Sequence, residues 1–256
     1  MTENTPPDDL FAVFLEALED PDYSMKELAV RGLAVLGDRR AIPPILDSLG
    51  DSEESEGYRL FCRRAIAAIG RIGDATAVVP LFRTLCRAAE RCSIFEDYRY
   101  EEEYLDDALM EVAGMGPGVI EPLGEVITGD YPLDIRVTAI RTLGYVHGPD
   151  PVLFLLEVLR DRSCGNDIAP YVACGLGARR AEEAVDDLCR IILDTVNYGE
   201  RTRLFAVSAL EEIGDPRALR SLLKVFADPE RFGEASTFAY EAFRSIISEM
   251  ESRPED

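Results

Sequence analysis

The sequence predicts an all-α protein, folded as an α-solenoid of about seven antiparallel helix pairs. A glycine recurs at intervals of 36, 43, 32, 29 and 37 residues, which lies in the range of helix-pair repeats. An apolar helical pattern precedes each glycine, and no stretch shows the alternation that is typical of a β-strand. The recurring glycines are Gly37, Gly73, Gly116, Gly148, Gly177 and Gly214.

The helix before each glycine carries an apolar stripe with i, i+4, i+7 spacing, which places the three side chains on one face. In the second repeat this stripe is Ala65, Ile69 and Ile72. The small alanine allows a neighbouring helix to approach closely. Stripes of the same form are Ala29, Leu33 and Leu36; Ala108, Val112 and Met115; and Ala206, Leu210 and Ile213.

A glycine followed by aspartate predicts a tight turn between the two helices of a pair. Glycine adopts the left-handed conformation that commonly ends a helix, because it has no Cβ. The aspartate side chain can then accept hydrogen bonds from the first N–H groups of the next helix. Asp38, Asp74 and Asp215 stand at this position, whereas Pro117 and Ala178 replace the aspartate in two repeats.

A second apolar stripe follows each turn, and longer polar connections then lead to the next pair. Leu219, Leu222 and Phe226 form one such stripe. We expect a flexible N-terminus over 1–7, a single solenoid over 8–250, and a flexible C-terminal tail over 251–256.

Three turn segments share a recognisable sequence, GDRRAIPPIL at 37–46, GDATAVVPLF at 73–82 and GDPRALRSLL at 214–223. They resemble the HEAT-like repeat typified by the phycobilisome lyases, and the resemblance extends over about residues 8 to 250. It implies a helical solenoid. Members of this class are often scaffolds, adaptors or regulatory subunits, and a few are chromophore lyases or isomerases.

The charge balance restricts the possible partners. The formal net charge of −22 repels nucleic acids and anionic lipid headgroups, so we expect neither a nucleic-acid nor a membrane partner. It favours a basic protein partner, or alternatively reflects adaptation to a saline cytoplasm. No apolar run approaches the roughly 20 residues of a membrane span, and the N-terminus does not resemble a signal peptide. We expect a cytoplasmic location.

Residues for catalysis or metal binding are scarce. The chain has one histidine, His147, and no C-x-x-C pair, so we expect no zinc or di-iron site and no cofactor. A Ser-His-Asp triad would need this histidine, and no Gly-x-Ser-x-Gly motif or phosphate-binding glycine loop is present. We therefore expect that the protein is not an enzyme.

The long insertion at 93–104 is the first candidate binding segment, because it combines aromatic and acidic residues that suit contact with a basic segment. An alternative is that the aromatics pack back on the array while the acids face water. The candidate residues are Phe95, Tyr98, Tyr100, Glu101, Glu102 and Glu103.

Tyrosines also recur in the connections between helix pairs, at Tyr23, Tyr58, Tyr131 and Tyr198. Equivalent positions line up along one edge of a solenoid, so these residues predict a ladder that contacts a partner. The alternative is that each ring covers the end of a repeat interface. Arginines near helix starts predict structural ion pairs, with anion binding as the alternative. They are Arg59, Arg63, Arg64, Arg136, Arg201 and Arg203.

Together these patterns favour a monomeric, non-catalytic scaffold or adaptor, which binds a basic protein through its concave face and its acidic and aromatic loops. The alternative function is a chromophore lyase or chaperone of the phycobilin-lyase type, which rests on the family resemblance.

Overall fold

The computed structural model describes residues 8–50, 55–89, 102–161 and 167–252 of the 256-residue chain. Over these ranges the chain forms fifteen α-helices and several short 3₁₀ turns, without a β-strand. The prediction of an all-α solenoid fold is confirmed. Contacts between residues divide the chain into two compact units, residues 1–148 and 149–256, and each unit is a stack of helix pairs.

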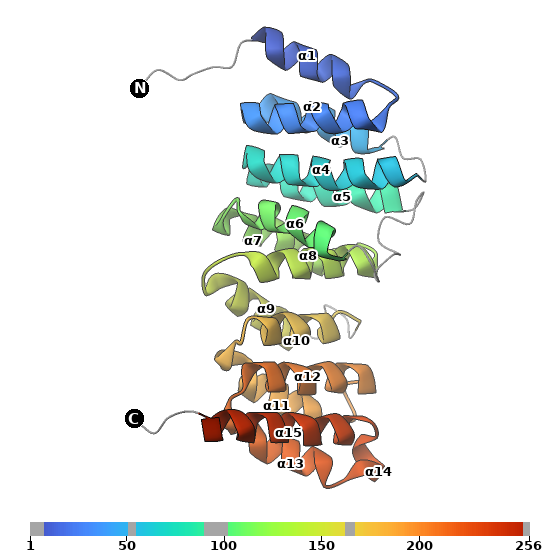
Figure 1. Ribbon diagram of the computed structural model, residues 1–256. Helices are drawn as coiled ribbons and strands as arrows, with labels where there is room; N and C mark the ends of the chain where they lie inside the picture. The colour runs from blue at the N-terminus through green and yellow to red at the C-terminus, as the bar shows by residue number, and fades with distance from the viewer. Residues whose placement is uncertain (1–7, 51–54, 90–101, 162–166, 253–256) are drawn as a thin grey trace. The chain divides into compact units, whose positions relative to one another are not determined.

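The first unit is a two-layer stack in which successive pairs lie side by side (Figure 1). Helices α2, α4, α6 and α8 form one layer and α3, α5 and α7 form the other, while α1 packs on α2. Their bounds are α1 (Asp8–Leu18), α2 (Tyr23–Leu36), α3 (Ile42–Gly50), α4 (Glu56–Ile72), α5 (Val78–Ala89), α6 (Glu102–Ala113), α7 (Ile120–Thr128) and α8 (Leu133–Tyr145).

The second unit repeats this plan. Helices α10, α12 and α15 form one layer, and α11 and α13 pack together in the other. The sequence predicts a plain connection over 228–233, but a four-residue helix capped by the Asp228 side chain forms there. The bounds are α9 (Asp150–Arg160), α10 (Ala169–Ala178), α11 (Val185–Leu193), α12 (Glu200–Ile213), α13 (Leu219–Phe226), α14 (Pro229–Phe232) and α15 (Ala235–Ser252).

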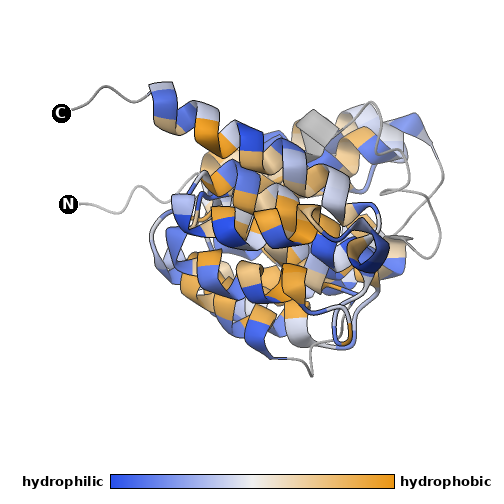
Figure 2. Ribbon diagram, turned by 90° about the horizontal axis from the view of Figure 1, so that it is seen from below, coloured by the Kyte–Doolittle hydropathy of each residue, from blue (hydrophilic) through white to orange (hydrophobic). Residues whose placement is uncertain are grey.

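The predicted apolar stripes form the core of each stack. Ala65 and Ile69 on α4 are completely buried, and so are Ala206 and Leu210 on α12. Hydrophobic and hydrophilic residues share the same helical ribbons (Figure 2), as expected for amphipathic helices with one face in the core.

The predicted glycine–aspartate turn occurs three times with the same geometry. Each glycine is left-handed, and its N–H donates to the carbonyl four residues earlier, which ends the helix. The following aspartate accepts a hydrogen bond from the N–H two residues on, and thereby caps a 3₁₀ turn that leads into the next α-helix. These turns lie at Gly37–Asp38 (glycine φ 65°), Gly73–Asp74 (78°) and Gly214–Asp215 (70°).

Gly177 does not form the turn that its spacing predicts. It lies inside α10, and a Cβ at this position would be 2.7 Å from the Cα of Ala209 on α12. Glycine is therefore needed for the close approach of two helices. The left-handed residue that ends this repeat is Arg180, with φ of 49°. Measured from Arg180, the intervals to Gly148 and Gly214 become 32 and 34 residues.

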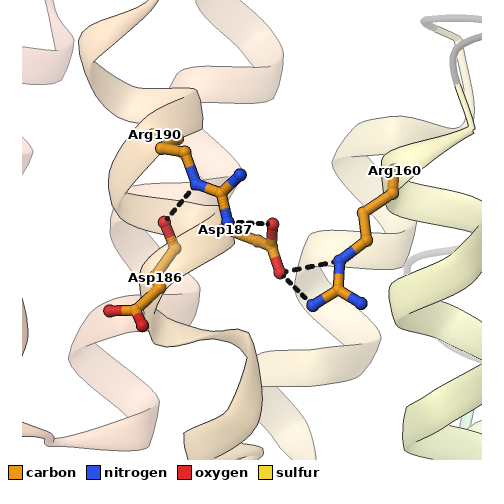
Figure 3. A network of polar contacts seen from close by, with 4 residues as sticks. All are labelled: Arg160, Asp186, Asp187 and Arg190. Carbon is orange, nitrogen blue, oxygen red and sulfur yellow. Dashed lines mark hydrogen bonds and ion pairs between the residues drawn. The ribbon is translucent and has the colours of Figure 1, made fainter.

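A polar cluster joins neighbouring repeats of the second unit (Figure 3). Asp187 on α11 is only 6% exposed. Its Oδ2 accepts hydrogen bonds from Nε and Nη2 of Arg160 on α9, at 3.0 and 2.6 Å. Its Oδ1 lies 2.8 Å from Nη2 of Arg190, one turn along α11. The buried charge is thus compensated from two sides.

In the part of the chain that the structure describes, no helix has both the length and the apolar character required to cross a membrane.

Candidate functional site: two charged hollows

The first hollow lies between α12 and α15 in the second unit and has a volume of about 490 Å³. Three glutamates, Glu211, Glu241 and Glu251, line it together with one arginine, Arg244. Arg244 Nη1 lies 3.4 Å from Glu241 Oε2. The described lining residues therefore carry an excess of two negative charges. Its remaining members are Phe243, Ser245, Ile247 and Ser248.

Carboxylates are crowded beside this hollow. Partial burial raises the pKa of Glu212, the neighbour of Glu211 on α12, and the charge of Glu211 raises it further. Arg180 opposes these effects by favouring the ionised form. A cation bound near Glu211 would relieve the repulsion between the two carboxylates.

The second hollow is a groove between α4 and α6 in the first unit, with a volume of about 690 Å³. We call it the arginine groove. Arg63, Arg64 and Arg71 of α4 line it, facing Asp107 and Glu111 of α6. Its apolar lining residues are Leu60, Ala67, Ala108 and Met110.

Glycine and ion pairs hold the two helices of the arginine groove close together. A Cβ at Gly70 of α4 would lie 2.5 Å from the carbonyl carbon of Glu111, so only glycine permits this approach. Nε and Nη2 of Arg71 donate to Glu111 Oε1 at 2.9 and 2.7 Å. This hydrogen bonding, together with the carboxylate charge, raises the pKa of Arg71. Arg64 Nε lies 3.2 Å from Glu27 Oε1 on α2.

A smaller hollow of about 190 Å³ extends the cationic surface toward α2. Arg31 of α2 lines it with Arg64 and Arg71, which also line the arginine groove. The two hollows suit opposite ligands. Guanidinium groups bind carboxylates and phosphates, whereas clustered glutamates bind cations. Among the described residues, neither lining contains a histidine or a cysteine.

Two of the predicted ladder tyrosines contact each other inside the first unit. Tyr58 is completely buried, and its hydroxyl donates to the Leu49 carbonyl at 2.7 Å. The half-buried Tyr23 packs edge-on against it, with 5.6 Å between ring centroids. Burial corrects the prediction at this position, because the Tyr58 ring has no surface to offer a partner. At these two positions the rings cover a repeat interface, which was the alternative interpretation.

The other predicted contact residues are dispersed. Tyr131 is half-buried beside Gly129. Tyr198 lines a hollow of about 410 Å³ with Arg160 and Arg190. Phe95, Tyr98, Tyr100 and Glu101 lie outside the described residues. Glu102 and Glu103 begin α6, and their side chains also fall outside the description, so a contact role for this segment stays a prediction.

The predicted arginines make varied contacts. Arg64 forms the expected ion pair with a neighbouring repeat. Arg136 and Arg203 instead donate to backbone carbonyls, those of Ile127 and Tyr198, both at 2.8 Å. Arg201 donates to the Tyr171 hydroxyl. Of these four arginines, one pairs with an acid, and the other three donate to a backbone carbonyl or a tyrosine hydroxyl.

Sequence reasoning missed both hollows as units. The spacing of Glu241, Arg244, Ser248 and Glu251 places them on one face of α15, which was a usable signal. No local pattern indicated that Glu211 of α12 would join them, because that depends on how the two helices pack.

Comparison with known proteins corrects the predicted function. Deoxyhypusine hydroxylase of Bos taurus is 27% identical over 230 residues, which cover 84% of this chain and 74% of the relative. This relative is an enzyme. The prediction of a non-catalytic scaffold or adaptor that is not an enzyme is therefore wrong.

Two solved structures align with most of this chain. Human deoxyhypusine hydroxylase in complex with glycerol is 21% identical, with a TM-score of 0.42, over 91% of this chain and 84% of that one. The CpcE–CpcF complex of phycocyanin lyase from Nostoc sp. is 15% identical, with a TM-score of 0.36, over 96% and 97% of the two chains.

Family models match two parts of the chain. The model for HEAT repeats matches residues 11–91, and the model for the PBS lyase HEAT-like repeat matches residues 202–228. The expected resemblance to HEAT-like repeats is confirmed by these two matches.

Proposed function

We propose that this chain binds a protein segment that carries a lysine-derived, positively charged side chain, the substrate class that the name of its hydroxylase relative specifies. The observation that carries this proposal is the 27% identity over 84% of the chain. The net charge of −22 supports it, because a strongly acidic protein attracts a cationic substrate.

The glutamate-lined hollow between α12 and α15 is the proposed site. The side chain of deoxyhypusine is a long aliphatic chain that ends in an amine. A site that binds it therefore needs both negatively charged and apolar lining residues. Glu211, Glu241 and Glu251 supply the charge. Phe243 and Ile247, both half-buried, supply apolar surface for the methylene groups.

The hydroxylation step itself does not fit the residues of this chain. Oxygen-dependent hydroxylation is carried out with groups such as haem, flavin, copper or non-haem iron. Non-haem iron is typically held by two histidines and one carboxylate, but His147 is the sole histidine in the sequence. Among the described residues no group of three His, Cys, Asp or Glu side chains is placed to hold a metal ion. We therefore derive no oxygen chemistry from these residues.

Calorimetric titration with a peptide that carries deoxyhypusine tests the proposal. We expect binding at physiological salt, where the Debye length of about 8 Å screens the overall field. The same peptide with its side-chain amines acetylated should not bind. Equal affinity for both peptides would contradict a cation-binding function.

A matched pair of variants locates the site. Glu211→Gln/Glu241→Gln/Glu251→Gln should weaken binding by about tenfold or more, because charge-assisted contacts are lost. Glu16→Gln/Glu121→Gln/Glu125→Gln changes the net charge equally at exposed positions of the first unit, and should bind as the native chain does. Equal weakening in both variants would assign binding to the overall charge instead.

A cytoplasmic location and a monomeric state stay predictions.

A further inference from the structure

The arginine groove does not suit a cationic ligand, and nothing in the proposed function uses it. We propose that it binds an acidic peptide segment with a carboxylate and a neighbouring apolar side chain. This site is separate from the glutamate-lined hollow, so each proposal can fail without the other.

Charge is the first argument. Among the described residues, the groove lining has three guanidinium groups and two carboxylates, an excess of positive charge within a chain whose net charge is −22. Arg31, in the adjoining hollow, adds a fourth guanidinium group. Such a local reversal selects an anionic ligand even though the rest of the surface repels it.

The arginines retain donor capacity. A guanidinium group has five N–H donors in a planar fork. The ion pair with Glu27 uses one donor of Arg64, and the pair with Glu111 uses two of Arg71. These two side chains are 52% and 58% exposed. The guanidinium group of each can therefore donate hydrogen bonds to a second carboxylate while its structural ion pair stays in place.

Apolar exposure selects a peptide over a simple anion. Leu60 and Met110 line the same groove and are 41% and 48% exposed. An apolar side chain that covered them would gain about 25 cal/mol for each Å² of apolar surface buried.

Calorimetry with three probes tests this proposal. An end-capped peptide of alternating glutamate and leucine is expected to bind the intact chain. The corresponding glutamine–leucine peptide, without charge, should not bind, and inorganic phosphate should not displace the first peptide. Displacement by millimolar phosphate would overturn the peptide assignment in favour of a phosphate site.

Variants of the groove provide the second test. Arg64→Gln/Arg71→Gln should weaken binding of the glutamate–leucine peptide by about tenfold or more. Arg83→Gln/Arg87→Gln makes the same charge change on exposed positions of α5 and should leave affinity within about twofold. Equal affinity of the two variants would exclude the groove.

A third variant covers the case in which loss of the structural ion pairs disturbs the fold. Met110→Gln changes an exposed side chain and should fold as the native chain does, as circular dichroism can check. It should still weaken the peptide measurably. Native affinity in Met110→Gln would show that the apolar wall does not contact the ligand.

Discussion

Arg160 on α9 and Asp187 on α11 are joined by two hydrogen bonds to a single carboxylate oxygen, Asp187 Oδ2, at 3.0 and 2.6 Å. The two side chains differ sharply in environment. The Asp187 side chain is 8% exposed, whereas that of Arg160 is 56% exposed. The aspartate is therefore the member of the pair that depends on its partners, because removal of a partner leaves a buried charge uncompensated.

Asp187→Asn should consequently lower the melting temperature by a few degrees, since both Arg160 and Arg190 lose their carboxylate. Asp186→Asn is the matched control, because the exposed Asp186 enters the cluster through its backbone carbonyl. Arg160→Gln combined with Asp187→Asn should destabilise less than the sum of the single changes. Strict additivity in thermal melts would show that the two residues do not interact energetically.

Tyr58→Phe removes the hydroxyl that satisfies the buried Leu49 carbonyl. The expected loss is about 1–2 kcal/mol of unfolding free energy, because a buried carbonyl is left without this donor. Tyr131→Phe, at a half-buried position, should cost less. Urea denaturation measures both. Equal losses would mean that the Tyr58 hydroxyl stabilises the fold no more than the hydroxyl of a half-buried tyrosine does.

The sequence was sufficient to predict the helices and three of the turns, because these depend on local chemistry. Gly73 and Asp74 fix one turn by contacts within a few residues along the chain. The spacing of Gly177 predicted a turn, but this glycine instead permits the close approach to Ala209, thirty-two residues later. Sequence spacing cannot distinguish a glycine required by conformation from one required by a neighbour.

The candidate sites were harder to predict from the sequence, because they too depend on contacts between helices. The amino-acid composition predicted the charge of a ligand only for the chain as a whole. It did not indicate which parts of the surface would attract anions and which would attract cations. The arginine groove arises because Gly70 lets α6 approach α4 and brings Met110 beside Arg71. No pattern within either helix reports that approach. Tyr58 shows the converse, because a residue type common at interfaces is here part of the core.

Arg180→Gly should stabilise the protein, because Arg180 occupies the left-handed region with φ of 49°. Relief of about 1–2 kcal/mol of left-handed strain exceeds the roughly 0.4–1 kcal/mol by which glycine favours the unfolded chain. High salt during the measurement screens the attraction between Arg180 and Glu212.

Arg179→Gly is the control for that substitution, because its φ of −86° suits any residue. Glycine there should destabilise. If both variants lose stability by chemical denaturation, the left-handed conformation at Arg180 is not strained.

Glu212→Gln should stabilise the protein at neutral pH and not at low pH. Burial raises the pKa of Glu212 in the folded state, so folding is favoured when this group is protonated. The contribution of Glu212 to the free energy of unfolding is complete below the pKa of the unfolded state, near 4.5. It is lost as pH rises through the pKa of the folded state. The Glu212→Gln variant has no carboxyl group at this position, so its stability does not fall in this way as pH rises.

Unfolding free energies from pH 4 to 7 measure the difference between Glu212→Gln and the native chain. The gap should widen as pH rises. Glu125→Gln makes the same chemical change on α7 and serves as the control. A constant gap would contradict the raised pKa.

Purified protein incubated with ferrous iron under argon and then desalted should retain much less than one iron per chain by elemental analysis. The sequence has one histidine, and among the described residues no group of three His, Cys, Asp or Glu side chains is placed to hold a metal ion. The bovine relative's activity supplies the second measurement, the mass gain of one oxygen atom on a deoxyhypusine peptide. Stoichiometric iron together with that mass gain would show that residues outside the described ranges complete a metal centre.

The glycine–aspartate turn also bears on how such a chain can change in evolution. The hydrogen bonds that shape each turn come from its own residues: the glycine N–H donates to the carbonyl four residues earlier, and the aspartate side chain accepts from the N–H two residues later. A duplicated or deleted repeat would therefore bring its own corner with it. Gene-level duplication of the segment between two such turns would lengthen the array by one unit, and only the helix faces at the new junction would need to adapt.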